Sequence, residues 1–314
     1  MHNFSIGAKS LKHAGSKQLN NQVFNFSPNN WMAATPQIDS LSLLELTLPG
    51  THNAGSDWQA SYPFFGPPRH WLACQHDSFY AQLHNGARAL DIRLSWDPKG
   101  VGLGKFRAQH NGFLNSRTLG DLLTDTRNFL DRNPDEFILI DFHQLEGEGF
   151  NLVYFHDMVI HLLGDRIIPA HNQHLSLGQL KRISTQQRVL VAAPLPREVN
   201  RSVFLEQVMH KWSGNGITHS DELQHYISEV MKSPPGTWRP WSLSATSYSA
   251  LGGPVDIHRE LDRWFDPQTS DWAINCNIIN VDFIEESRIV AYCRAVNLKK
   301  ALGRPASYMS LMAG

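Results

Sequence analysis

Imidazoles, carboxylates and a guanidinium stand at or just after the ends of short apolar runs in this sequence. Imidazole titrates near neutral pH, so it can serve as a proton acceptor or donor, whereas a guanidinium stays positively charged. If the runs are neighbouring strands, these groups converge on one rim and form an acid–base site. The residues are His52 with Asn53, Asp91 with Arg93, His110, Asp141 with His143, and Asp282.

The apolar runs alternate with stretches of helical spacing, a pattern typical of a parallel sheet covered by helices. Six or more such units in about 280 residues favour a (β/α) barrel over two small domains. We therefore predict an α/β fold, a TIM-like barrel in a regular or an irregular, incomplete form. Strands are predicted at 44–48, 89–94, 137–142, 188–193, 241–248 and 277–283, and helices at 118–132, 152–163 and 285–300.

Composition excludes several classes of protein. Of the 314 residues, 41% are hydrophobic, enough to bury a large core. The net charge of −1 and the lack of a basic run argue against nucleic acid as a partner. The three cysteines form no C-x-x-C pair, which excludes a zinc ribbon and a full disulfide framework and leaves one bridge open. No apolar stretch is long enough for a transmembrane helix.

The first residues differ from the rest of the chain. Residues 1–30 are polar and rich in Asn and Ser, which predicts a tail or an accessory segment ahead of a barrel domain at 31–314. They contain no unbroken apolar core of a secretory signal. Two locations therefore remain as alternatives: the cytoplasm, or the outside of the cell after export by a non-classical route.

Four segments, in this order, resemble the phosphatidylinositol-specific phospholipase C X-domain family. They are LPGTHNAG at 48–55, GARALDIRLSWDP at 86–98, AQHNG at 108–112 with the run at 118–145, and the strand and helix at 278–297. The sequence is most similar to the bacterial single-domain enzymes and the X-domain-only proteins. The resemblance implies a TIM-like barrel with its active site at the carboxyl ends of the strands.

The resemblance also implies a reaction. The inositol 2-hydroxyl attacks the phosphorus of the lipid phosphodiester, which releases diacylglycerol and a cyclic inositol phosphate. His52 matches the base and Asp282 the carboxylate that orients it, while His110 matches the acid. Arg93 matches the clamp on the phosphate oxygens, because a guanidinium binds two oxygens at once.

Two departures from the family pattern bear on metals and on the acid. The acidic pair of calcium-dependent members reads Ala89-x-Asp91 here, and Arg93 places positive charge where the ion would sit. We therefore expect no metal and no cofactor, with calcium disfavoured. Asn53 replaces the aspartate of the metal-free enzymes. Asn111 separates His110 from its glycine, which leaves the acid assignment more open than the base.

Four residues are expected to bind the substrate: Asn53, Asp91, Asp141 and His143. A purely structural role of Asp91, in bonding loop amides, is an equal alternative. Asp141 and His143 follow the strand at 137–142, near the position where the bacterial family has a lysine that touches substrate. Only one of these two side chains is expected to point into the barrel.

Aromatic residues raise the question of a membrane. A Pro-rich loop after His52 and the stretch PPGTWRPW supply the expected contacts Trp58, Phe64, Phe65 and Trp238. Rim loops of a lipid-cleaving barrel must touch the bilayer, and Trp favours its interface. The expected partner is thus a phospholipid at a membrane surface, with the protein peripheral to it. Alternatively, the rings pack together as an internal lid.

Two other functions stay open from the sequence. Residues 150–275 align poorly with the family and carry much of the head-group pocket, so a lipid phosphodiesterase of other head-group specificity is one alternative. A catalytically silent lipid-binding barrel is the other, favoured by Asn53 and by the irregular HNG motif. The presence of the base, its carboxylate and the acid together argues against a barrel that lacks catalytic activity.

Overall fold

Residues 26–194, 196, 200–249 and 251–304 are described by a computed structural model of the chain. Most of the predicted N-terminal segment, residues 1–25, lies outside this range. The end of this segment is bound to the barrel, because the backbone carbonyls of Pro28 and Asn29 accept hydrogen bonds from the buried Arg88 side chain.

Parallel strands follow one another around a curled sheet, in the order β6-β5-β2-β1-β11-β8-β7 among the described residues. Their bounds are β1 Leu48–Thr51, β2 Ala89–Trp96, β5 Ile138–Glu146, β6 Val189–Ala192, β7 Met209–Lys211, β8 Trp241–Ser244 and β11 Ile278–Val281. A hairpin of β3 (Phe106–His110) and β4 (Phe113–Thr118) pairs with the last residues of β2, on the edge whose first residues pair with β1, and β3 is antiparallel to β2.

The barrel is open along one seam. Within the described part of the chain no ladder joins β6 to β7, and an isolated parallel bridge pairs Ala192 of β6 with Leu205, which precedes β7. The predicted α/β fold, a TIM-like barrel in its irregular and incomplete form, is therefore confirmed.

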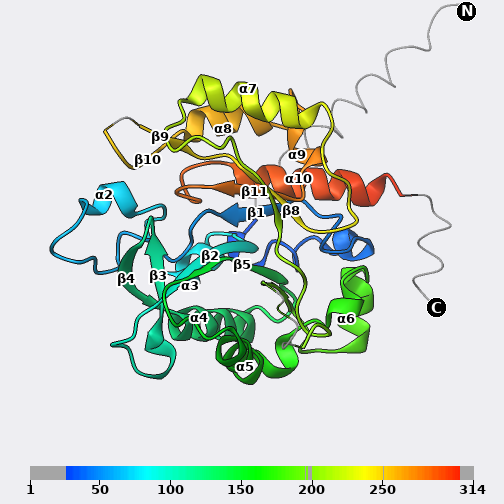
Figure 1. The fold of residues 1–314 in the computed structure, drawn as a ribbon. Coiled ribbons are helices and arrows are strands. Elements are labelled where there is room, and N and C mark those ends of the chain that lie inside the picture. Colours follow the sequence, from blue (N-terminus) through cyan, green and yellow to red (C-terminus); the bar gives the residue numbers. More distant parts are fainter. Residues whose placement is uncertain (1–25, 195, 197–199, 250, 305–314) are drawn as a thin grey trace, which may run out of the picture.

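Helices cover the outside of the sheet. Figure 1 shows α4, α5 and α6 on one side of the strands and α7, α8 and α10 on the other. The helices are α2 Arg69–Leu72, α3 Phe79–His84, α4 Leu119–Arg132, α5 Leu152–Leu163, α6 Leu177–Ile183, α7 Ser220–Met231, α8 His258–Phe265, α9 Trp272–Asn275 and α10 Ile289–Leu302. Short 3₁₀ turns are η1 Pro28–Asn30, η2 Pro36–Ser40, η3 Gly102–Lys105, η4 Gly164–Arg166 and η5 Ala170–Asn172. No helix of the described residues combines the length and apolarity needed to cross a membrane.

Local sequence explains why α4 begins and ends where predicted. Thr118 accepts a hydrogen bond from the Asp121 amide, and the Asp121 carboxylate accepts one from the Thr118 amide, which forms a capping box. Asn133 ends the helix ahead of a proline, which disfavours helical backbone at the residue before it. The helix then leads directly into β5.

The first strand differs from its prediction. The run 44–48 is mostly a buried turn, and the strand instead contains Pro49 and Gly50. The turn is held by the Asn277 amide, which donates to the carbonyls of Leu43 and Leu46. Gly50 is required because a Cβ there would lie 2.3 Å from the Asn280 Oδ1 of the neighbouring strand β11.

Two other predicted elements have different bounds. The run 241–248 divides into β8 and the short strand β9 (Ser247–Tyr248), which pairs with β10 (Pro254–Val255) as a hairpin. The helix predicted at 285–300 begins at Ile289, because a turn follows β11 first. The one disulfide that the sequence left open does not form, since Cys74, Cys276 and Cys293 all carry free thiols.

A buried ion pair holds the starts of β2 and β5 at the opposite end from the site. The Arg88 guanidinium lies 2.6 Å from the Glu136 carboxylate, and both side chains are fully buried. Glu136 also accepts hydrogen bonds from the amides of Met32 and Ala33. Removal of one charge of such a pair costs about 3–5 kcal/mol, so these residues support the scaffold.

Candidate active site

His52 and Asp282 meet at the carboxyl ends of the neighbouring strands β1 and β11. His52 Nδ1 lies 2.8 Å from Asp282 Oδ1. A carboxylate only accepts, so Nδ1 carries the hydrogen and Nε2 keeps its lone pair for a substrate proton. Burial raises the pKa of the Asp282 carboxyl, and the positive charge that His52 can carry opposes this.

The backbone around this pair is fixed by Gln75. Its amide donates to the carbonyls of His52 and Val281, and its oxygen accepts from Ile284, so one side chain ties the two strand ends together. Phe283 has φ +51°, an uncommon value for a bulky residue. This sharp turn brings the chain back directly after Asp282.

His110 ends β3 and faces His52. The two rings are 6.3 Å apart between centroids and nearly perpendicular. His110 Nδ1 lies 2.7 Å from the Leu72 carbonyl, which only accepts, so Nδ1 is protonated. Nε2 therefore accepts from the Tyr248 hydroxyl at 2.8 Å. Burial lowers the pKa of His110 to about 4, aided by the charges of His52 and Arg93 and opposed by the Leu72 bond.

The inserted Asn111 has a simple structural explanation. Asn111 and Gly112 form the two-residue turn between β3 and β4, with φ of +52° and +82°. Asn-Gly is the preferred pair for such hairpin turns because both positions need positive φ. His110 pairs with Phe113 directly across the turn, so the insertion leaves the histidine at the strand end.

Arg93 is held at the rim by Asp91. Its Nη2 and Nε lie 2.9 and 3.3 Å from the two carboxylate oxygens. The same carboxylate accepts a hydrogen bond from the backbone N–H of Asn53 at 3.3 Å. Burial disfavours the charged carboxylate, but Arg93 and nearby histidines outweigh it and hold the Asp91 pKa well below its usual range. Asp91 thus bonds a loop amide, as its structural alternative predicted, and also orients the guanidinium.

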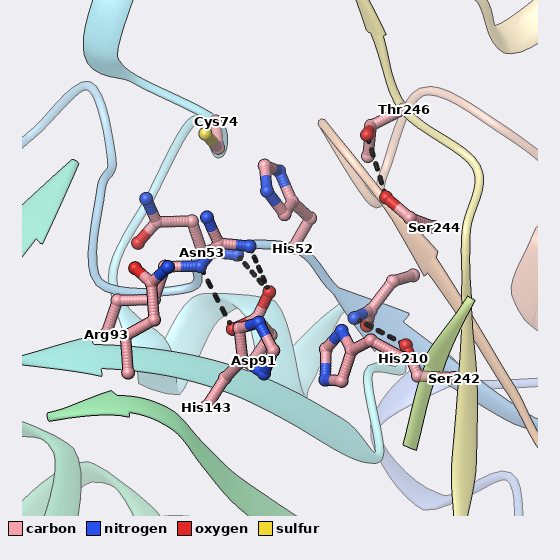
Figure 2. Close-up of polar contacts among 12 residues, drawn as sticks. His52, Asn53, Cys74, Asp91, Arg93, His143, His210, Ser242, Ser244 and Thr246 are labelled. Carbon is pink, nitrogen blue, oxygen red and sulfur yellow. Dashed lines mark hydrogen bonds and ion pairs between the residues drawn. The ribbon is translucent and has the colours of Figure 1, made fainter. Parts of the chain in front are cut away.

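Asn53 presents a side chain without a partner. Its φ of +41° is left-handed, a conformation that Asn tolerates better than most residues. Both polar atoms of its amide are buried and have no hydrogen-bond partner. Because such groups are normally satisfied, the amide is available to a ligand. Figure 2 shows it beside Arg93, Asp91 and His52.

Asp141 and His143 form a second cluster with His210 of β7. His210 Nε2 lies 2.6 Å from Asp141 Oδ2, and the rings of His143 and His210 stack at 3.7 Å. The expectation that only one of Asp141 and His143 points into the barrel is wrong, because residues two apart on a strand share a face. Burial disfavours charge on His210, but the bond to Asp141 outweighs it and raises the His210 pKa.

Sequence reasoning missed three residues of the site: Cys74, His210 and Tyr248. Tyr248 belongs to a two-residue strand and His210 to a three-residue one, too short for a period to be seen. Cys74 Sγ lies 3.5 Å from the Tyr248 hydroxyl, and burial raises the pKa of its thiol, so it stays protonated. No motif in the sequence marks these positions.

The aromatic residues that were expected to contact a membrane lie in different parts of the structure and differ in exposure. Phe64 and Phe65 are 94% and 87% exposed and touch one another edge to face. Their loop runs past Phe113, which begins β4 next to His110. Trp58 is half-buried, and both its amide and its carbonyl are hydrogen-bonded within the loop.

The placement of Trp238 at the active rim is wrong. Trp238 is 63% exposed but precedes the first residue of β8, so it lies where the strands begin. Its neighbour Thr237 lines a pocket with Leu41 and Leu44, which precede β1. The stretch PPGTWRPW therefore connects α7 to β8 at the end opposite to His52.

Comparisons with known proteins find similar sequences for about half of the chain. No family model matches the sequence. PI-PLC X domain-containing protein 3 of Mus musculus is 28% identical over 196 residues, 54% of this chain and 59% of that protein. The variant-surface-glycoprotein phospholipase C of Trypanosoma cruzi is 33% identical over 130 residues, 38% of this chain and 32% of that protein.

Solved structures extend the likeness to most of the chain. The phosphatidylinositol-specific phospholipase C of Listeria monocytogenes superposes with a TM-score of 0.64 at 18% identity, over 86% of this chain and 99% of the other. The resemblance to the PI-PLC X-domain family is confirmed. A mutant of the Staphylococcus aureus phospholipase C gives a TM-score of 0.62 at 15% identity over 85% of this chain.

These likenesses to phospholipases C differ in what they cover. The solved bacterial enzymes share the fold with this chain over nearly their whole length. The chain spans about 59% of the length of the curated X-domain relatives. The barrel fold is therefore the part held in common with the bacterial enzymes.

Proposed function

We propose that this chain is a phospholipase C-type phosphodiesterase that cleaves phosphatidylinositol to diacylglycerol and a cyclic inositol phosphate. One observation carries the proposal above all others. A histidine held by a carboxylate faces a second histidine across 6.3 Å, beside a half-buried guanidinium. Base, acid and phosphate clamp are the groups that an intramolecular attack on phosphorus requires.

The first half of the reaction uses His52. Its Nε2 takes the proton of the inositol 2-hydroxyl as that oxygen forms a bond to phosphorus. Asp282 keeps the hydrogen on Nδ1 and stabilises the imidazolium that forms. Arg93 and the unpartnered Asn53 amide bind the non-bridging oxygens, where negative charge develops.

The second half uses His110. In the free site its imidazole is neutral, and Nε2 accepts from Tyr248. The negative charge of a bound phosphodiester favours the protonated form of a neighbouring histidine. His110 then donates the proton on Nε2 to the glycerol oxygen as the phosphorus–oxygen bond breaks. During this transfer Nε2 donates to the glycerol oxygen and no longer accepts from Tyr248, while the bond from Nδ1 to the Leu72 carbonyl keeps the ring in place.

We propose that this chemistry needs no calcium. Calcium takes six to eight oxygen ligands, and the residues around Asp91 fit it poorly. Ala89 offers no ligand side chain, and the Arg93 guanidinium already binds both oxygens of Asp91. Arg93 supplies the positive charge that an ion would bring.

A phosphodiesterase for another head group is the second candidate. Asp141, His143 and His210 form a polar wall next to Asp91. The bacterial family has a lysine near His143, so this wall offers different hydrogen-bond partners to a head group. Inositol hydroxyls suit imidazole and carboxylate groups, which favours the first candidate.

The lipid must reach the site from a membrane, and we propose that Phe64 and Phe65 insert there. They are the most exposed large apolar side chains of the loop that follows His52. Such rings at the rim place the site against the head groups while the protein stays peripheral.

An assay on untagged protein tests the proposal. Vesicles of phosphatidylinositol or of phosphatidylcholine are incubated with the protein, with and without EDTA, and the phosphorus products are followed by ³¹P NMR. We expect a cyclic phosphate from phosphatidylinositol alone, unchanged by EDTA, and none from folded His52→Ala. Equal release by His52→Ala overturns the mechanism, and vesicle binding without turnover identifies a silent barrel. Turnover of phosphatidylcholine instead would support the second candidate.

A further inference from the structure

The cluster of Asp141, His143 and His210 has the composition of a metal site. One carboxylate oxygen and one nitrogen from each ring all lie within 4.8 Å of one another. Asp141 and His143 come from β5, and His210 comes from β7 on the other side of the seam. Figure 2 shows His143 and His210 below His52, next to Asp91.

One atom of this cluster lacks a partner. His143 Nδ1 is buried and makes no hydrogen bond, although it lies 4.0 Å from Asp141 Oδ2. A buried imidazole nitrogen without a partner calls for a ligand, because such groups are normally satisfied. A cation between the three side chains would satisfy Nδ1 and replace the direct contact of His210 with Asp141.

We propose that Asp141, His143 and His210 bind one transition-metal ion of the zinc class. Imidazole nitrogens suit Zn²⁺, Co²⁺, Ni²⁺ or Fe²⁺, whereas calcium and magnesium prefer oxygen ligands. Three protein ligands leave a fourth position for water or for a substrate oxygen. The side chains of His143 and His210 are 27% and 12% exposed, so an ion can reach the cluster from solvent.

The surrounding charges permit a cation. Arg93 is the nearby positive group, and the Asp91 carboxylate that binds it on two oxygens brings a negative charge beside it. Asp141 adds a negative charge within the cluster. The only other contact of its carboxylate within the described residues is from the Val208 amide to Oδ1 at 3.4 Å, so Oδ2 is left for the ion.

The fold gives this site a structural consequence. Gln207 and Val208 already cross the seam, with hydrogen bonds to the His143 carbonyl and to Asp141. An ion held by β5 and β7 would clamp the barrel where no ladder joins its edges. An ion that binds only the folded chain stabilises it, so the melting temperature should rise with metal concentration.

Metal binding itself is the test, and it is independent of whether the chain cleaves a lipid. The untagged protein is freed of metal with a chelator and titrated with Co²⁺ and Zn²⁺. We expect one equivalent of Co²⁺, the intense visible absorption of a four-coordinate ion, its displacement by Zn²⁺, and a higher melting temperature with either ion.

Two variants and one control locate the site. His143→Ala and His210→Ala should each weaken the affinity at least about 100-fold, since even outer partners of metal ligands contribute 10–100-fold. His76→Ala is the control, because His76 also pairs with a carboxylate, Glu285, at 2.6 Å but lies outside the cluster. It should bind as the wild type does.

The outcomes separate clearly. Failure of the folded wild type to bind Co²⁺, or wild-type affinity in both variants, overturns the proposal. If a variant does not fold, the wild type still decides, because bound Co²⁺ must shift the NMR signals of the His143 and His210 rings. Shifts confined to other histidines would refute the site.

Discussion

His52 and Asp282, which are 230 residues apart in sequence, lie 2.8 Å apart between Nδ1 and Oδ1. The pairing of β1 with β11 brings them together, because parallel neighbours place their carboxyl ends at the same edge. Thr51 pairs with Val281, so the next residue of each strand reaches the rim at the same level. The first and last parallel strands in the sequence, β1 and β11, thus supply the histidine base and the carboxylate that orients it.

Asp282→Asn should separate orientation from charge. The asparagine amide can donate to Nδ1 and so place the hydrogen on Nε2, where it blocks proton abstraction. We expect kcat to fall about 10²–10⁴-fold with little change in KM, and the melting temperature to stay near that of the wild type. Steady-state kinetics on phosphatidylinositol vesicles measure this. An undiminished kcat would show that Asp282 does not position the base.

Tyr248→Phe should change the proton affinity of His110. The hydroxyl donates to Nε2 and stabilises the neutral ring, so its loss should raise the His110 pKa from its value of about 4. A hydrogen bond of about 0.5–1.5 kcal/mol corresponds to a rise of up to about one unit. Proton NMR of the His110 ring across pH measures it. An unchanged pKa would mean that the hydroxyl does not bind Nε2 in solution.

Much of the fold was predictable because apolar runs and helical spacing report burial directly. The strand at 89–94 and the helices at 118–132 and 152–163 follow this rule. The first strand did not, because Leu44 and Leu46 are buried in a turn, whereas Pro49 and Gly50 join the sheet. Gly50 is explained by the side chains of Asn280 and Ile278, which lie far from it in the sequence.

The residues of the site likewise divide into those that the sequence predicts and those that it does not. Residues at strand ends within recognisable motifs, such as His52, Arg93 and Asp282, were predicted to gather, and the structure brings them to one rim. Tyr248 and His210 could not be predicted, because tertiary packing and not a local pattern places them beside His110 and Asp141.

The stability of the protein should fall with acid in a way that depends on His110. Its folded pKa of about 4 lies below the ordinary value of 6.5, so the unfolded chain takes up the proton first as pH falls. Stability is therefore full above pH 6.5 and decreases down to pH 4, by about 3 kcal/mol for this group. Urea unfolding of wild type and His110→Gln across this range should show a shallower slope for the variant. Parallel slopes would contradict the prediction.

Phe64 and Phe65 should govern binding to vesicles without touching the chemistry. A phenylalanine ring that moves from water into an apolar layer contributes about 1.5–3 kcal/mol. Phe64→Ser with Phe65→Ser should therefore weaken partitioning onto phosphatidylinositol vesicles at least about tenfold and spare cleavage of a water-soluble, short-chain substrate. Trp238→Ala is the matched control, because this exposed ring lies at the opposite end of the barrel and should not affect partitioning. If the control weakens vesicle binding as much as the double variant, the membrane faces the other end; equal losses of vesicle binding and soluble turnover in the double variant would instead assign the two rings to a lid.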